Sequence, residues 1–232
     1  MESARLFGDT KRRHVGLSHR LQPRDLDGIL AIAAGQVLFH EGSRLDFVFE
    51  ILCGTLKTSK VSEDGRQLIF GFPTAGDIIG VAGFNEYTET VETVTPARLL
   101  PIPRAKFFKE LTEGTRATEK FLCWFNQYED RRRDHVTLLS MHRPASRVAG
   151  FLLQIARTQS PGKLKDAVQI HLPMTQRDIS HYLAVAPETY SRVMRQFRES
   201  EIVGEKKSLG GGHNVEIAHL GRLEKIANGG EI

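Results

Sequence analysis

The stretch LPMTQRDISHYLAVAPETYSRVMRQFRESEIV, residues 172–203, decides the fold of the second half of this chain. Apolar residues at helical spacing predict two helices, joined by the short turn AVA at residues 184–186. Thr175 followed three residues later by Asp178 is a capping-box start for the first helix. Pro187 suits the first position of the second helix. Two helices joined in this way predict a helix-turn-helix, a unit that places its second helix in the major groove of DNA.

The second helix, expected over residues 187–199, has two faces. Val193, Met194 and Phe197 are spaced to pack inward, like Ile179, Tyr182 and Leu183 of the first helix. Polar side chains share the opposite face at i, i+3, i+4 and i+7, namely Glu188, Ser191, Arg192 and Arg195. A solvated face with a simple Glu188–Arg192 salt bridge is the alternative interpretation.

The chemistry of this face predicts which residues read bases. An arginine fork matches guanine O6 and N7, a glutamate accepts from an exocyclic amine, and a serine contacts several base edges. We therefore expect Glu188, Ser191 and Arg192 to read bases. The residues expected to contact phosphates or to support the readers are Thr175, Gln176, Arg177, Pro187, Thr189, Arg195, Lys206 and Lys207.

The flanking segments predict a winged helix-turn-helix domain over residues 143–232. A helix is expected at residues 145–159, a strand at 168–172, a hairpin around the glycines 210–212, and a last helix at 220–227. The last 90 residues hold 13 Lys and Arg against 9 Asp and Glu, so the whole net charge of +4 lies there. Phosphate attraction depends on such local charge.

The first half of the chain predicts a β domain. Between residues 31 and 103, short strand-like runs such as QVLFH, FVFEIL and QLIFGF alternate with glycine-containing turns, which favours a barrel or a sandwich. Residues 61–69 predict a hairpin turning at Gly65. Pro101 and Pro103 are expected to end the β region. With the N-terminal arm, in which residues 23–29 predict a short helix, this domain is expected to span residues 1–112.

Residues 113–142 predict a long helix that also forms a dimer contact. After a short amphipathic helix and a break near Gly114, apolar residues at about 115–141 cover more than one narrow stripe. The extra face predicts a homodimer through the same helix of a second copy; burial between two domains of one monomer is the alternative. The expected dimer contacts are Phe121, Trp124, Phe125, Tyr128, Leu138 and Leu139.

Composition excludes several classes. No apolar run approaches the roughly 18 residues of a membrane span, and no secretory signal is present, so we expect a cytoplasmic protein without membrane contact. Cys53 and Cys123 stand in apolar surroundings, which predicts inert buried thiols. No nucleophile–base pair, paired carboxylates, phosphate loop or metal motif occurs. We expect no enzyme, no catalytic residue, no metal and no cofactor.

These motifs together resemble the CRP/FNR superfamily of bacterial transcription regulators over nearly the whole chain. The β region resembles its cyclic-nucleotide-binding-type β-roll through Gly35, His40-Glu41-Gly42, Cys53-Gly54 and Gly76-Asp77-Ile78-Ile79-Gly80. The segment RVAGFLL, residues 147–153, resembles the first helix of its DNA-binding domain. Glu188-Thr189-Tyr190-Ser191-Arg192 resembles the E-x-x-S-R motif of the FNR/FixK branch. The resemblance implies an α+β fold, a palindromic DNA site with TTGA in each half, and RNA polymerase as a partner.

Three departures from the family pattern shape the functional expectation. The segment 81–92, where cyclic-AMP binders carry an Arg-Ser pair, has no Arg and three Glu, which argues against a cyclic phosphate. The N-terminal arm has no cysteine, which excludes an oxygen-sensing iron–sulfur cluster there. At position 187 the FNR/FixK branch usually has a side chain able to touch a thymine methyl, whereas this chain has Pro187. A FixK-like factor without a known ligand is the leading hypothesis; the alternative is a regulator gated by haem, gas or a small molecule, with candidate ligands His14, His19, His40, His135 and His142.

Overall fold

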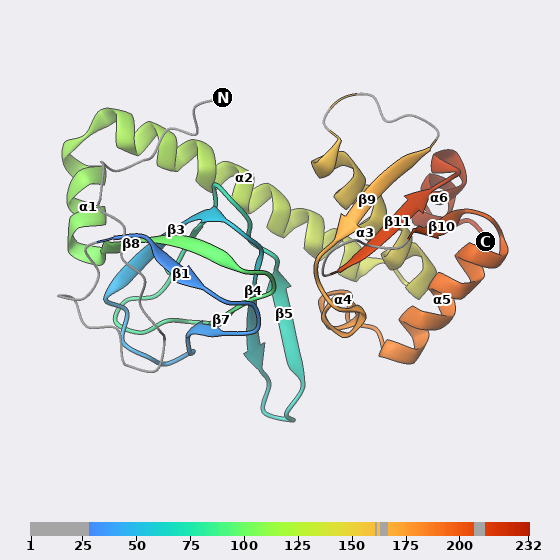
Figure 1. The fold of residues 1–232 in the computed structure, drawn as a ribbon, viewed down its shortest axis with the longest axis horizontal. Coiled ribbons are helices and arrows are strands. Elements are labelled where there is room, and N and C mark those ends of the chain that lie inside the picture. Colours follow the sequence, from blue (N-terminus) through green and yellow to red (C-terminus); the bar gives the residue numbers. More distant parts are fainter. Residues whose placement is uncertain (1–27, 161, 163–166, 207–211) are drawn as a thin grey trace. The chain divides into compact units, whose positions relative to one another are not determined.

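The structure of the protein is a computed structural model that describes residues 28–160, 162, 167–206 and 212–232, without the side chains of residues 205 and 206. The chain forms two compact units, Met1–Arg131 and Arg132–Ile232 (Figure 1). The expected helix at residues 23–29 lies almost entirely outside the described residues. No helix among the described segments is long and apolar enough to span a membrane.

The first unit is the expected β-roll. One sheet has the strand order β1-β8-β3-β6 and the other β2-β7-β4-β5. The strands are β1 (Leu30–Ile32), β2 (Val37–Phe39), β3 (Phe47–Cys53), β4 (Leu56–Val61), β5 (Gln67–Gly71), β6 (Ile78–Ile79), β7 (Thr90–Thr93) and β8 (Ala97–Pro103). Residues from both sheets, among them Phe49, Leu56 and Leu99, form one buried cluster. The strand pattern of the sequence is therefore confirmed, and the core lies between the sheets.

The β region ends at Pro103, as expected, but Pro101 does not interrupt it, because both prolines lie within β8. They pair with Phe49 and Phe47 of β3. The N–H of Arg104 points to β3, where it donates to the Asp46 carbonyl at 2.9 Å. Since N–H groups alternate along a strand, positions 101 and 103 face the other edge, and β1 pairs there only as far as Leu99. The missing proline N–H groups therefore cost no ladder bond.

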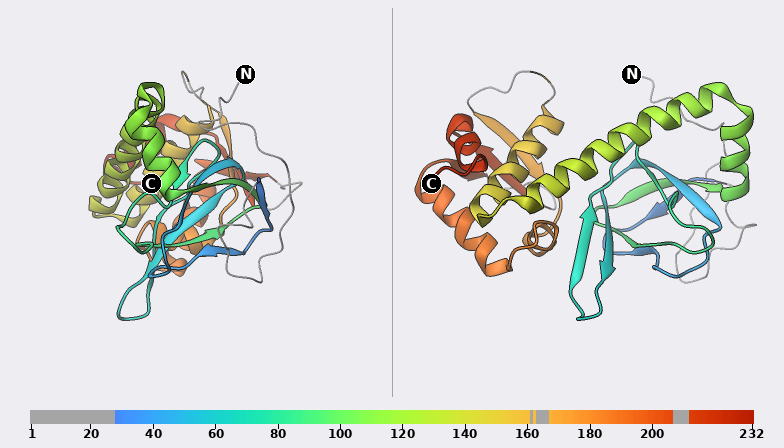
Figure 2. Two further views of the ribbon diagram at one scale, coloured as in Figure 1. Left: turned by 90° about the vertical axis from the view of Figure 1, so that its left-hand side faces the viewer. Right: turned by 180° about the vertical axis from the view of Figure 1, so that it is seen from behind.

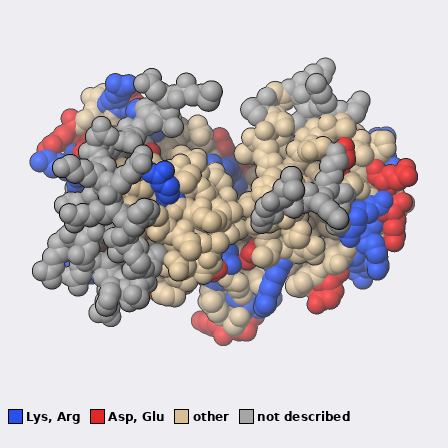
Figure 3. All heavy atoms as spheres, in the orientation of Figure 1, with Lys and Arg blue, Asp and Glu red and all other residues tan. Residues whose placement is uncertain are grey.

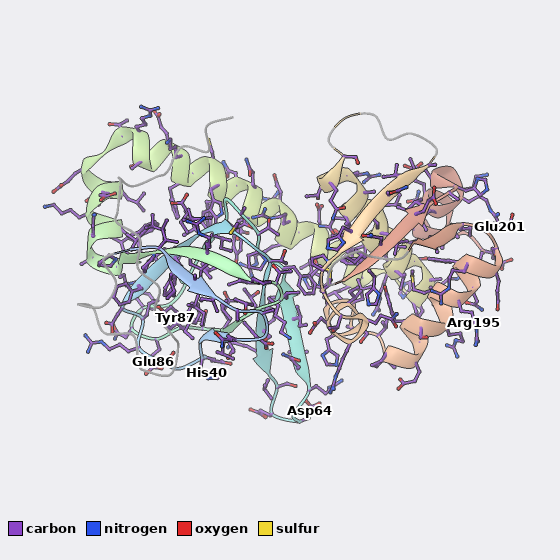
Figure 4. The ribbon with its side chains drawn as sticks, in the orientation of Figure 1. His40, Asp64, Glu86, Tyr87, Arg195 and Glu201 are labelled. Carbon is purple, nitrogen blue, oxygen red and sulfur yellow. The ribbon has the colours of Figure 1, made fainter. Side chains whose placement is uncertain are left out.

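The hairpin at residues 61–69 is confirmed. β4 and β5 pair antiparallel, and they extend as a narrow arm with Asp64 at its tip (Figures 2 and 4). Gly65 has φ +80°, the left-handed region that glycine adopts at little cost. The carboxylate of Asp64 accepts from Ser62 Oγ at 2.5 Å and from Arg66 Nε at 2.6 Å. These bonds hold the pKa of Asp64 well below its usual range.

A second glycine makes a testable contribution to the stability of the β-roll. Gly54 has φ +97°, and a Cβ there would lie 2.6 Å from the Pro96 carbonyl oxygen. We expect Gly54→Ala to lower the unfolding free energy by about 2–4 kcal/mol in urea melts, from left-handed strain plus the clash. Gly35 (φ +73°) has open space around its Cα. Gly35→Ala should therefore cost only the strain, about 1 kcal/mol; equal losses for both variants would contradict this explanation.

Two helices complete this part of the chain. α1 (Arg104–Glu113) ends before Gly114, and α2 (Thr115–Ser140) begins directly after it, as the sequence predicts. Phe121 and Trp124 of α2 pack on a second buried cluster that contains Val48, Ile78 and Phe107.

A buried carboxylate fixes this docking of α2 on the β-roll. Asp77 accepts from Trp124 Nε1 at 3.4 Å and forms an ion pair with Arg131. It also accepts from the backbone N–H of Thr74 at 2.9 Å, so one side chain ties the turn before β6 to α2.

The second unit has the expected winged helix-turn-helix order. α3 (Pro144–Gln159) is followed by β9 (Val168–Leu172), α4 (Gln176–Tyr182), α5 (Pro187–Glu199), β10 (Val203–Lys206), β11 (His213–Ile217) and α6 (Leu220–Ala227). The three strands pair antiparallel in the order β10-β11-β9. Fully buried Phe151 and Leu152 of α3, Phe197 of α5 and Leu223 of α6 form the core. The α+β fold class is confirmed.

The prediction of buried thiols is wrong, because Cys53 and Cys123 are both exposed. Cys53 is the last residue of β3 and follows a register shift after Ile51, which turns it out of the core alternation. Cys123 lies on α2 between exposed Leu122 and half-buried Trp124. Apolar neighbours in sequence therefore do not mean apolar neighbours in space for either residue.

Candidate nucleic-acid interface

The first helix of the pair begins with a complete capping box. The backbone N–H of Asp178 donates to Thr175 Oγ1 at 3.0 Å, and the Thr175 N–H donates to the Asp178 carboxylate at 3.3 Å. Ile179, Tyr182 and Leu183 are buried, as their spacing predicts. Thr175, Gln176 and Arg177 are exposed at the start of α4, where phosphate contacts are sterically open.

A tight turn connects α4 to α5. Ala184 has φ +50°, which is a left-handed conformation that non-glycine residues adopt at a cost of about 1–2 kcal/mol. The N–H of Val185 donates to the Ser180 carbonyl at 3.0 Å, and Val185 is half-buried between the helices. Pro187 then stands at the start of α5, where its missing N–H is not needed.

The two faces of α5 are separated as expected. Tyr190, Val193, Met194 and Phe197 are buried, while Glu188, Ser191, Arg192 and Arg195 are exposed. Tyr190 is an addition that the spacing argument did not include. Arg195 points outward from α5 (Figure 4) and lies 3.9 Å from Glu199. Within the described residues Glu188 and Arg192 form no ion pair, so the simple salt-bridge alternative is not supported.

The remaining residues expected to contact phosphates or to support the readers differ in exposure, and two of them are not fully described. Pro187 is exposed and Thr189 is half-buried near the start of α5. The side chain of Lys206 and the whole of Lys207 lie outside the described residues. In Figure 3, basic and acidic atoms adjoin along the right-hand edge, in the part of the view that holds α5. A face of mixed charge suits selective base contacts better than uniform attraction to phosphates.

The residues expected at a dimer contact do not share one environment. Phe121 and Trp124 pack on the β-roll, and Tyr128 stacks on Trp124 at 5.4 Å between ring centroids. Leu138 is buried. The large apolar side chains of α2 that remain exposed are Leu122 (52%), Phe125 (42%) and Val136 (66%), and Leu139 is half-buried. We therefore move the proposed seam to Leu122, Phe125, Val136 and Leu139, which helical spacing places on one side.

The β-roll segment at residues 81–92 does not fit a cyclic phosphate. Arg104 donates to the carbonyls of Val81 at 3.4 Å and Gly83 at 2.9 Å, so its guanidinium is committed to the backbone. Lys57 pairs with Glu92 at 3.3 Å. The three glutamates of the segment add negative charge that repels an anion.

An aromatic side chain of this segment fills part of the β-roll interior. The ring of Tyr87 stacks on Phe39 at 3.6 Å between centroids, and its hydroxyl donates to the Phe47 carbonyl at 2.8 Å. Burial raises the pKa of Tyr87 above its usual value, so the phenol stays neutral. The position therefore offers a ligand neither a cation nor an anion.

The histidines weighed as haem ligands are distributed without a common site. His14 and His19 lie outside the described residues; His40 and His142 are exposed. No group of three or more His, Cys, Asp and Glu that could hold a metal occurs in the described ranges. His135 is buried, and its Nε2 lies 2.7 Å from the Tyr182 carbonyl, so the ring is already engaged inside the second unit.

The environment of His135 predicts a pH dependence of stability. Burial lowers its pKa below the ordinary value of 6.5. The neutral ring is favoured in the folded state, so the stabilisation is fully present above about pH 6.5 and is lost as the pH falls through the folded-state pKa. We expect the unfolding free energy in urea melts to fall between pH 7 and pH 5. His135→Gln, which keeps a donor, should flatten this slope, whereas exposed His142→Gln should not; the same slope in both variants would contradict the assignment.

Models of known protein families match each of the two units. Residues 29–113 match the model of the cyclic nucleotide-binding domain, and residues 146–226 match the Crp-like helix-turn-helix domain. The crystal structure of FixK2 from Bradyrhizobium japonicum superimposes with a TM-score of 0.71 at 23% identity, covering 85% of this chain and 95% of that one. This likeness concerns the fold.

Curated relatives align over most of the chain. The transcriptional activator FnrA of Stutzerimonas stutzeri is 29% identical over 81% of this chain and 79% of its own. FnrL of Cereibacter sphaeroides is 26% identical over 93% and 89%, and the fumarate and nitrate reduction regulatory protein of Escherichia coli is 25% identical over 84% and 77%. A β-roll of the cyclic-nucleotide-binding type joined to a Crp-like helix-turn-helix, with relatives of this kind, places the chain in the CRP/FNR superfamily of transcription regulators.

Proposed function

We propose that this protein is a homodimeric, cytoplasmic transcription regulator that reads a palindrome with TTGA in each half-site. The observation that carries the proposal is the exposed face of α5, where Glu188, Ser191 and Arg192 stand on a helix fixed by four buried side chains. Arg192 would read a guanine through O6 and N7, and Glu188 an exocyclic amine. The relatives are named as transcriptional activators, which supports activation through RNA polymerase as the mode of action.

The proposed homodimer fits a palindromic site, because two identical recognition helices match a two-fold symmetric DNA sequence. Two recognition helices must lie about one helical turn of DNA apart, roughly 34 Å, to enter successive major grooves. The exposed apolar side chains Leu122, Phe125 and Val136 on α2 offer a surface for the second copy. Contact through them would remove the exposed apolar area of both helices from water at once.

The β-roll is proposed to act without a cyclic nucleotide. The acidic segment 81–92 and the committed guanidinium of Arg104 support this part of the proposal. We expect cyclic AMP or cyclic GMP to leave DNA affinity unchanged in fluorescence anisotropy. Protein purified after haem supplementation should show no Soret band. An affinity change of tenfold or more with either nucleotide, or a stoichiometric Soret band, would favour the ligand-gated alternative.

The proposed function is tested by titrating a labelled DNA that carries the TTGA palindrome. A scrambled site and a single half-site serve as controls. We expect the palindrome to bind at least about 10³-fold more tightly than the scrambled DNA. Affinity for both should fall as salt rises, because phosphate contacts release counterions. Equal affinity for the palindrome and the scrambled site would contradict the proposal.

A further inference from the structure

The C-terminal end of α4 has a specific set of hydrogen-bond partners. The carbonyls of Ile179, Ser180 and His181 accept from backbone N–H groups of the turn. The next three carbonyls, those of residues 182, 183 and 184, accept from side chains that belong to other helices. Carbonyls at a helix end carry partial negative charge and need donors, so these side chains determine how the turn is held.

Arg147 supplies two of these contacts. It lies in the first turn of α3, and its NH1 group donates to the Leu183 carbonyl at 3.2 Å and to the Ala184 carbonyl at 3.1 Å. Its Nε donates to the Met141 carbonyl at 2.8 Å, directly after the end of α2. One half-buried guanidinium therefore joins the end of α2 to the turn of the helix-turn-helix. A planar group with donors on several edges is suited to such a three-point contact.

His135 supplies the third contact from α2. Its ring stacks on the Tyr182 ring at 3.8 Å with an interplanar angle of 6°, and Nε2 contacts the Tyr182 carbonyl. Burial lowers the pKa of His135, so at neutral pH the ring is neutral and must carry its proton on Nε2 to donate. Close packing supports the same docking, since a Cβ on Gly150 of α3 would lie 2.5 Å from Leu138 Cδ2.

We propose that Arg147, assisted by His135, is a positioning residue that fixes the recognition helix relative to the end of α2. The inference rests on the proposed DNA-reading function of α5. Ala184, whose carbonyl Arg147 holds, has a strained left-handed φ and stands three residues before α5. Without the guanidinium this turn can relax and α5 can change its angle. The guanidinium is directed at protein carbonyls and acts through the turn, not on DNA.

The geometry of base contacts gives the proposal its signature. Hydrogen bonds to base edges weaken steeply with small errors of distance and angle, whereas attraction to phosphates tolerates them. Loss of the positioning contact should therefore lower affinity for the palindrome and leave affinity for unrelated DNA nearly unchanged. A residue that merely attracts phosphate would lower both together and would reduce the salt slope.

The test measures affinity for the palindromic and the scrambled DNA in Arg147→Met, Arg147→Lys and Arg143→Met. Arg143 is exposed near the same helix end and donates to the Gly229 carbonyl at 3.3 Å, so Arg143→Met removes the same charge without touching the turn. We expect Arg147→Met to reduce the ratio of palindrome to scrambled affinity by about tenfold or more. Arg147→Lys, which reaches fewer carbonyls, should give an intermediate ratio, and Arg143→Met the wild-type ratio.

Three outcomes separate the possible failures. If the wild-type protein bound the palindrome no more tightly than scrambled DNA, the proposed function itself would be rejected. A normal wild-type ratio with an unchanged ratio in Arg147→Met would overturn the positioning role alone. Equal losses on both DNAs in Arg147→Met and Arg143→Met would assign Arg147 to phosphate attraction, which also overturns it. If Arg147→Met does not unfold cooperatively, Arg147→Lys takes its place. The ratio of palindrome to scrambled affinity in Arg147→Lys is then judged by the same outcomes.

Discussion

Replacing Phe125 and Val136 by glutamate is expected to give a monomer that binds the palindromic site about 10²–10⁴-fold more weakly than the wild-type protein. Both side chains are exposed, at 42% and 66%, and helical spacing places them on one side of α2. Each copy of the variant would carry both glutamates in the apolar seam. Dimer formation would therefore bring like charges together and remove them from water, and both effects oppose contact between the copies. A monomer then loses the gain in affinity that comes from two linked half-sites.

The control variant for this experiment is Gln127→Glu. Gln127 is an exposed residue on a different side of the same helix, so it adds negative charge to α2 without entering the seam. It should remain dimeric in analytical ultracentrifugation and bind the palindrome as the wild type does. A dimeric Phe125→Glu/Val136→Glu double variant with full affinity would show that α2 does not hold the copies together through this side.

The second large effect is expected for Arg192→Ala, which should lower affinity for the palindrome by about 5- to 150-fold, or about 1–3 kcal/mol. The guanidinium is exposed on α5 with no ion pair to Glu188, so it is available for a bidentate contact with guanine. Preference for guanine at one position of each half-site should disappear. Affinity for scrambled DNA should change far less.

Arg195→Ala is the matched comparison on the same helix. Arg195 is exposed one turn further along α5 and lies near Glu199 at 3.9 Å, which partly neutralises it. We expect its removal to weaken binding to all sequences alike and to reduce the salt slope by about one. If Arg192→Ala behaved in this uniform way instead, Arg192 would be a phosphate contact and the base-reading set would be wrong.

Much of the fold follows from local signals in the sequence. The capping box at Thr175 and Asp178, the proline at the start of α5 and the glycine of the β4–β5 turn each depend on residues close in the chain, and the structure has each of them. The spacing of Val193, Met194 and Phe197 identifies the buried face of α5 for the same reason. Periodicity reports which side chains share a face and which face is apolar.

The rest depends on contacts between distant segments. Pro101 and Pro103 remain in β8 because β1 is short, which no local pattern in residues 97–103 reveals. The aromatic residues of α2 divide between the β-roll and the exposed side, and periodicity alone cannot say what each stripe meets. The contacts of Arg147 with residues 183 and 184 join positions 36 and 37 residues apart, so composition and spacing gave no signal for them.

The central claim, that two copies of α5 read a symmetric TTGA site, is tested most directly by selecting bound DNA from a random pool with the full-length protein. The account predicts enriched sequences that contain two inverted TTGA half-sites with centres about one helical turn apart. It also predicts that the guanine of each half-site loses enrichment when the selection is repeated with Arg192→Ala. Enrichment of a single, non-symmetric motif, or of palindromes without TTGA, would contradict the claim.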